Sequence, residues 1–174
     1  MNSDLKHDFE TSEPVSKHPP VLTIEDVMTF QLNRLVAIGE RAGQQWSERM
    51  FDLSLNEWRL LALVKARAPC RAGDVADLLL MDKSQTSRVI KSLLKKDLIR
   101  NMPDPSDGRA VALRPTQKGE ELYVEVFAEV MRSNERVLAT LSVEEAQAFH
   151  QTLKKLINHS QKLLEKRLGR KVVR

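Results

Sequence analysis

Residues 73–119 decide the fold of this chain, and they read GDVADLLLMDKSQTSRVIKSLLKKDLIRNMPDPSDGRAVALRPTQKG. The stretch predicts a short helix, a turn, a second helix with a polar and basic face, and two short strands around PDPSDGR at 103–109. Between Asp82 and Arg100, six basic residues face two acids, a local charge of +4 that equals the formal net charge of the whole chain. Because DNA is a dense line of negative charge, these cations on one helix predict a DNA-binding module.

The composition predicts a mostly α-helical, soluble protein with a small β-wing. Of 174 residues, 41% are hydrophobic and 30% charged, whereas six glycines and one tyrosine are too few for a many-stranded sheet. No apolar run approaches the roughly 20 residues that span a bilayer, and no secretory signal is recognisable, so we expect a cytoplasmic protein. The single cysteine, Cys70, excludes an intramolecular disulfide and fits a reducing compartment.

Capping signals and apolar spacing predict the remaining helices. Thr23 is the expected N-cap of one long amphipathic helix that runs to Met50, and Ser54 with Glu57 forms a capping box for the next helix. Ser142 and Glu145 form a second capping box. The last helix carries a narrow seam of Ala146, Phe149, Leu153, Leu156, Ser160 and Leu163. This seam predicts packing against another helix, either within the chain or from a second copy.

The second helix of the opening stretch is the candidate recognition helix. Thr86, Val89, Ile90 and Leu93 share its inward side. Short polar groups and Arg88 on the outward side suit base edges, and Lys91 is better placed for phosphates. The alternative is a solvated basic face. The predicted DNA-binding residues are Lys83, Ser84, Gln85, Ser87, Arg88, Lys91 and, from the hairpin, Arg109.

Arg109 lies beside the predicted hairpin turn, where it is suited to the narrow, negative minor groove. Asp107 is expected to hold the Arg109 guanidinium in a fixed direction. An ordinary Asp–Arg pair that stabilises the hairpin is an alternative, and the two interpretations are compatible.

These residues resemble the signature region of the MarR family, the multiple antibiotic resistance regulators. The family's wing pattern is matched by Asp104, Asp107 and Arg109, its recognition-helix pattern by Ser84, Ser87 and Arg88, and the boundary that follows by Leu113, Thr116 and Gly119. Pro105 and Ser106 depart from the basic residue that many members carry there. With weaker specificity, the likeness extends over about 24–168.

The resemblance implies a dimeric, ligand-responsive transcriptional regulator that binds a palindromic DNA operator, and repression is expected where the operator overlaps a promoter. The implied organisation is an N-terminal arm (1–20), a helical dimerisation region (21–52 and 115–168), a winged helix-turn-helix domain (53–114) and a basic tail (169–174). Asp104 and Asp107 would support the wing.

No cofactor is expected, but a small aromatic carboxylate effector is, because family members commonly sense such acids. Arg34, Arg41, Trp46 and Trp58 are the pocket candidates, although core packing for the tryptophans and solvation for the arginines are alternatives. As a whole the chain is similar to repressors of nicotinate breakdown, which would make a hydroxylated nicotinate the effector. No individual residue carries that likeness.

Three other functions are alternatives for this sequence. An enzyme is not expected, because His7, His18, His150 and His159 form no metal-spaced cluster and no catalytic motif occurs. A winged-helix adaptor without DNA binding would not need the basic helix or Arg109. A redox-sensing regulator would act through Cys70, whose pKa Arg67 and Arg71 could lower, but an inert thiol is the preferred interpretation.

Overall fold

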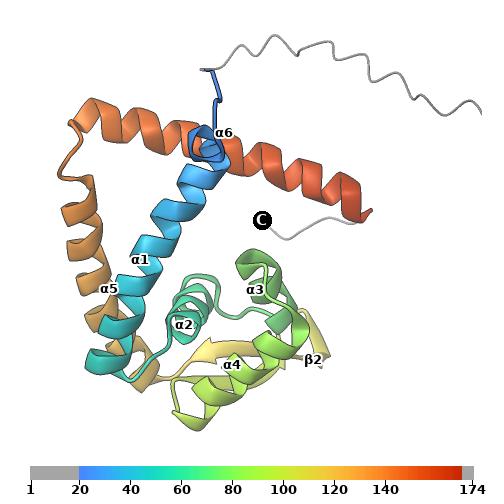
Figure 1. Ribbon diagram of the computed structural model, residues 1–174. Helices are drawn as coiled ribbons and strands as arrows, with labels where there is room; N and C mark the ends of the chain where they lie inside the picture. Colours follow the sequence, from blue (N-terminus) through green and yellow to red (C-terminus); the bar gives the residue numbers. More distant parts are fainter. Residues whose placement is uncertain (1–19, 170–174) are drawn as a thin grey trace, which may run out of the picture. The chain divides into compact units, whose positions relative to one another are not determined.

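The computed structural model describes residues 20–169, which form six α-helices, one short 3₁₀ helix and a two-stranded antiparallel sheet (Figure 1). The predicted class, mostly α with a small β-wing, is confirmed. The described residues belong to two compact units, one up to Arg41 and one from Ala42 onward. The predicted arm and basic tail lie almost entirely outside the described residues.

The first helical segment differs from the prediction of one unbroken helix. Thr23 does form a capping box, but it caps a 3₁₀ helix, Ile24–Asp26, and Val27 is extended before α1 (Met28–Phe51) begins. The Asp26 carboxylate accepts hydrogen bonds from the backbone N–H groups of Leu22 and Thr23. This short loop closes after one turn, so the chain restarts as α1 instead of continuing as the same helix.

The winged helix-turn-helix consists of α2 (Leu55–Arg67), α3 (Ala72–Leu79), α4 (Lys83–Lys95), β1 (Ile99–Asp104) and β2 (Asp107–Pro115). Its strands pair antiparallel in a register that places Ile99 opposite Pro115 and Asp104 opposite Asp107. Both strands extend into the segment 103–109 that the sequence predicts to separate them, and only Pro105 and Ser106 lie between them. A backbone bridge between Cys70 and Leu113 attaches the segment before α3 to β2.

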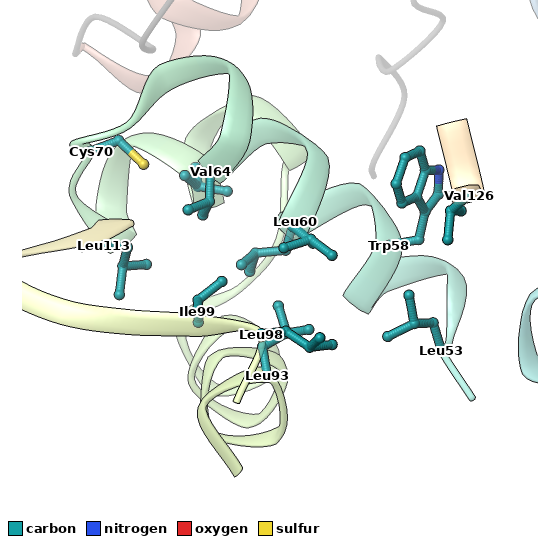
Figure 2. Packing of buried hydrophobic residues seen from close by; sticks show 12 residues of the cluster. Leu53, Trp58, Leu60, Val64, Cys70, Leu93, Leu98, Ile99, Leu113 and Val126 are labelled. Atoms are coloured by element: carbon teal, nitrogen blue, oxygen red, sulfur yellow. The ribbon is translucent and has the colours of Figure 1, made fainter. Parts of the chain in front are cut away.

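One hydrophobic core holds these elements together. Figure 2 shows the cluster, with Cys70 and Leu113 at one end and Trp58 and Val126 at the other. Leu60, Leu61 and Val64 of α2, Val75 of α3, and Leu93 of α4 are fully buried in it. Burial of such a side chain contributes about 1.5–3 kcal/mol, so the core fixes how α4 and the hairpin lie on α2.

Thr116 and Gly119 join the hairpin to α5 (Gln117–Leu138), as the sequence predicts for this boundary. The Thr116 hydroxyl accepts a hydrogen bond from the Gly119 N–H and donates one to the Asp97 carbonyl oxygen. A Cβ added at Gly119 would lie 1.9 Å from the backbone oxygen of Leu98. Only glycine therefore permits this close approach of helix and strand.

Helix α6 (Val143–Leu168) starts at the predicted Ser142–Glu145 capping box, and none of its residues is buried. On its predicted seam, Ala146, Leu153 and Leu156 are half-buried, while Phe149 and Leu163 are 43% and 51% exposed. An apolar seam left this open cannot stabilise a helix of 26 residues by packing within the described chain.

Candidate nucleic-acid interface

The N-terminus of α4 is fixed by a cap and by one buried threonine. Asp82 accepts a hydrogen bond from the Gln85 N–H at 2.7 Å, and the Thr86 hydroxyl donates to the Asp82 carbonyl oxygen at 2.8 Å. Thr86 is 5% exposed and Leu93 is fully buried. The inward side of α4 is therefore the one predicted, and the opposite side faces solvent.

The outward side of α4 presents most of the predicted DNA-binding residues together. Gln85 is half-buried, and the exposed members are Lys83, Ser84, Ser87, Arg88 and Lys91. Within residues 20–169, no carboxylate forms an ion pair with Lys83, Arg88 or Lys91. Their charges are thus open to an anionic partner, which is what phosphate contacts require.

Lys96, one of the six basic residues counted over this stretch, has a structural role instead. Its ammonium lies 3.2 Å from the Glu57 carboxylate and 3.5 Å from that of Asp52. Glu57 also accepts a hydrogen bond from the Ser92 hydroxyl at 2.6 Å. The sequence analysis missed this link, because the Ser54–Glu57 capping box explains the glutamate locally and gives no sign of a second helix.

The turn of the wing is organised by Asp104, which is 8% exposed. One of its oxygens accepts hydrogen bonds from the backbone N–H and the hydroxyl of Ser106, at 2.8 and 2.6 Å. Its other oxygen accepts a hydrogen bond from Arg71 Nε at 2.6 Å. The Ser106 hydroxyl and the Arg71 guanidinium hold the pKa of Asp104 far below its usual range.

The expected pairing of Asp107 with the Arg109 guanidinium is wrong. Asp107 accepts a hydrogen bond from the backbone N–H of Arg109 at 3.2 Å, and its ion pair, at 3.7 Å, is with Arg71. The Arg109 guanidinium is exposed and has no ion pair within the described chain. Asp107 therefore shapes the backbone beside Arg109 and leaves its side chain open.

Arg71 is the residue that the sequence analysis missed in this region, where it was considered only as a neighbour of Cys70. It precedes its partner Asp104 by 33 residues, and no local spacing or motif connects the two. A basic residue just ahead of α3, where Ser, Thr, Asp or Asn usually caps a helix, is the only available signal.

The candidate effector residues fall in different environments. Arg34 and Arg41 lie on α1 with exposed side chains. Trp58 is 8% exposed in the core, and its ring stacks on Tyr123 with centroids 5.6 Å apart. A role for these residues in effector binding stays a prediction.

Trp46, the fourth candidate, lies on the part of α1 that belongs to the second unit. Its ring meets Phe51 edge-on at 5.3 Å. Its Nε1 is buried without a hydrogen-bond partner, which is unusual for an indole N–H. A small polar molecule could satisfy this donor, so Trp46 remains a candidate for effector binding.

The structure does not show the lowered Cys70 pKa that a redox-sensing role would need. Cys70 is 7% exposed, and burial, together with Asp74, raises its pKa more than Arg67 lowers it. The guanidinium of Arg71 is committed to Asp104 and Asp107. A buried thiol with a raised pKa is a poor nucleophile and hence a poor oxidant sensor.

Residues 20–169 contain no group of three or more histidine, cysteine or acidic side chains placed to hold a metal ion. Among the helices of the described chain, none combines the length and the hydrophobicity needed to cross a bilayer.

Comparison with known proteins places the winged domain among regulators. Residues 51–110 match the model of the MarR family. The uncharacterised HTH-type transcriptional regulator YxaD of Bacillus subtilis is 28% identical over 137 residues, which cover 79% of this chain and 92% of YxaD.

Solved structures of MarR-family regulators have a similar fold. The crystal structure of a MarR/EmrR family transcriptional regulator from Acinetobacter sp. ADP1 superposes with a TM-score of 0.74 at 25% identity, covering 81% of this chain and 99% of that one. The structure of the MepR–DNA complex from S. aureus superposes with a TM-score of 0.70 at 19% identity, covering 80% and 100%, and shows the same fold.

Proposed function

Because the chain belongs to the MarR family of DNA-binding transcriptional regulators, we propose that it is a homodimeric repressor of an imperfectly palindromic operator. The family and its relatives are regulators and not enzymes. The observation that carries the proposal is the pair of unneutralised cationic surfaces, one on α4 around Arg88 and one on the wing at Arg109. Arg88 and its polar neighbours would contact base edges, and Lys91 would contact phosphates. Arg109 would enter the minor groove.

Dimerisation is supported by the open apolar seam of α6, which needs a partner to be buried. A second copy of the same helix, related by a two-fold axis, would supply a complementary apolar surface. The two copies of α4 would then lie about 34 Å apart, one turn of DNA. The two-fold axis requires the two half-sites to be in inverted orientation.

The proposed effector is a small aromatic carboxylate. A ligand that prefers a form of the dimer with misplaced recognition helices would lower operator affinity by population shift. The unpaired indole N–H of Trp46 is the candidate contact within the second unit. Arg34 and Arg41 stay candidates on the sequence alone. None of the relatives compared above indicates a nicotinate regulator, so the proposal is confined to the class of aromatic acids.

The test begins with selection of duplexes from a random library, followed by measurement of the dissociation constant across a range of salt concentrations. We expect an enriched inverted repeat and an affinity that falls steeply with salt, because each phosphate contact releases counterions. The double variant Arg88→Ala/Arg109→Ala should lose operator binding. Lys154→Ala/Lys155→Ala removes the same charge from exposed positions of α6 and should retain binding.

An adaptor without DNA binding would enrich no sequence and show no salt slope, and that result would reject the proposal. A monomer in solution at the concentrations that bind DNA would reject the dimeric form. A panel of benzoic, hydroxybenzoic and pyridine carboxylic acids tests the effector. An acid that raises the melting temperature should also release the operator, and if none does either, an aromatic acid is not the signal.

A further inference from the structure

The two-residue segment Cys70–Arg71 contacts the wing at two separate places. Cys70 and Leu113 exchange backbone hydrogen bonds of 3.2 and 2.8 Å, which attach the segment to the lower part of β2. Arg71 then reaches Asp104 at 2.6 Å and Asp107 at 3.7 Å, at the opposite end of the hairpin. Asp107 and Leu113 are six residues apart on one strand, about 20 Å at the usual rise.

Without the ion pairs of Arg71 with Asp104 and Asp107, little in the described chain would fix the direction of the turn between β1 and β2. A two-stranded hairpin is marginally stable by itself. Pro105, Ser106, Asp107 and Gly108 are all exposed, and Asp104 is the only buried residue of the turn and its flanks. Arg71 is therefore the contact that ties the far end of the wing to the helix-turn-helix.

Arg71 also occupies a position where its side chain does not cap its own helix. It is the N-cap residue of α3, and its side chain makes no capping hydrogen bond. Ser, Thr, Asp or Asn at an N-cap stabilises a helix by about 1 kcal/mol relative to a residue that cannot cap. The local stability of α3 thus does not account for an arginine here, whereas the bond to Asp104 does.

We infer that Arg71 is a positioning residue for DNA binding, which sets the direction of the wing by holding Asp104 and Asp107 and so places Arg109. Asp107 links Arg71 directly to Arg109, because it pairs with the Arg71 guanidinium and accepts a hydrogen bond from the Arg109 backbone N–H. The buried carboxylate of Asp104 also needs a partner, since an unpaired buried charge is costly. The inference rests on the proposed function, in which Arg109 contacts the operator.

A double-variant cycle on operator affinity tests it, with Arg71→Ala, Arg109→Ala and the double variant measured by fluorescence anisotropy on the selected duplex. We expect Arg71→Ala to weaken binding about tenfold in the natural background and less than twofold when Arg109 is already alanine, as for coupled residues. Arg71→Lys, which can still pair with Asp104, should restore part of the affinity. Arg114→Ala removes an exposed arginine from the same hairpin and should show no coupling to Arg109.

A spectroscopic measurement separates positioning from a general loss of structure. A nitroxide label at Gly108→Cys, an exposed site with open space around it, is placed in a Cys70→Ser background. Arg71→Ala should increase the mobility of this label in the absence of DNA, with the far-ultraviolet circular dichroism spectrum unchanged. If Arg71→Ala is too unstable to purify, Asp104→Asn breaks the same ion pair at similar size and replaces it in both measurements.

The outcomes are distinguishable. Equal weakening by Arg71→Ala in both backgrounds, or no weakening at all, overturns the inference and leaves the proposed function intact. An unchanged label spectrum overturns it as well. If Arg109→Ala itself binds the operator as tightly as the natural chain, the wing contact of the proposed function fails, and the positioning role fails with it.

Discussion

Glu57 of α2 accepts a hydrogen bond from Ser92 of α4 at 2.6 Å, while its other oxygen accepts the Ser54 backbone N–H at 2.7 Å. One carboxylate thereby caps one helix and holds the recognition helix against it. Lys96, 3.2 Å away, completes the arrangement.

Glu57→Gln should lower the free energy of unfolding at pH 7 by about 1–2 kcal/mol, because a charge-assisted bond to Lys96 is lost. Burial raises the pKa of Glu57, but bonds from Ser92, Ser54 and Lys96 outweigh it, so the net pKa is lowered. A lowered pKa contributes stability above the unfolded value of about 4.3, and this contribution is lost as the pH falls through the folded value. Urea unfolding should therefore show the deficit at pH 7 and a smaller one near pH 4.

Glu145→Gln is the matched control, since Glu145 closes the other α-helical capping box and has no bond to a second helix among those described. It should cost less than Glu57→Gln at pH 7. If both variants lower the free energy of unfolding equally, the link from Glu57 to α4 does not stabilise the fold.

Gly119→Ala should destabilise the protein by about 1–3 kcal/mol, because the new methyl group overlaps the Leu98 carbonyl oxygen and forces the backbone apart. Gly73→Ala provides the comparison, since Gly73 lies in α3 with open space around its Cβ position. That change should be neutral or stabilising by up to about 1 kcal/mol. Thermal unfolding of both variants decides the matter, and a stable Gly119→Ala would show that helix and strand are not held so closely.

Arg88→Ala and Lys91→Ala should affect DNA binding differently. Loss of Arg88 should cost about 1–3 kcal/mol and relax the preference for one base pair of the selected operator. Loss of Lys91 should weaken all duplexes alike and reduce the slope of log affinity against log salt by about 1. Binding titrations on the operator and on single-base variants at several salt concentrations separate the two. An identical pattern for both residues would contradict the division into base and phosphate contacts.

Replacement of Phe149 and Leu163 by glutamate should convert the dimer to a monomer, because both are exposed on the α6 seam and would need a partner to be covered. Multi-angle light scattering measures the mass of the protein in solution. Operator affinity should fall when the dimer is lost. The control variant Gln151→Glu/Lys155→Glu places acids on exposed positions of the same helix. If the seam variant stays dimeric, the dimer interface lies elsewhere.

Cys70 should react slowly with a thiol reagent in the folded protein and rapidly in urea, because burial raises its pKa and covers the sulfur atom. Peroxide should leave operator binding unchanged in both the natural chain and Cys70→Ser. Release of DNA by peroxide in the natural chain alone would reverse this conclusion and support the redox-sensing alternative.

Sequence patterns predicted those features that depend on neighbours along the chain. The capping boxes at Ser54 and Ser142, the inward position of Thr86 and the boundary at Thr116 are all confirmed. Each depends on spacings of three or four residues, where local hydrogen bonds determine the outcome.

The errors and omissions involve either a competing local bond or a distant partner. The helix breaks at Val27 because the Asp26 carboxylate accepts a hydrogen bond from the Thr23 backbone N–H. The spacing of apolar residues gives no sign of this bond. Arg71 and Asp104 are brought together because the hairpin pairs with the segment before α3, and a single sequence contains no trace of that pairing. The same limit applies to Lys96, whose charge is as visible in the sequence as that of Lys91 but is neutralised by Glu57 of α2.

Helix α6 has 26 residues and no buried side chain, so its stability depends on how much of the protein a cell makes. When such a surface is covered only by association, folding stability rises with protein concentration, and dilution alone weakens it. Newly synthesised chains at low abundance would then be the most vulnerable to degradation. Under the proposed dimer, the abundance of the regulator would set its own lifetime as well as its occupancy on DNA.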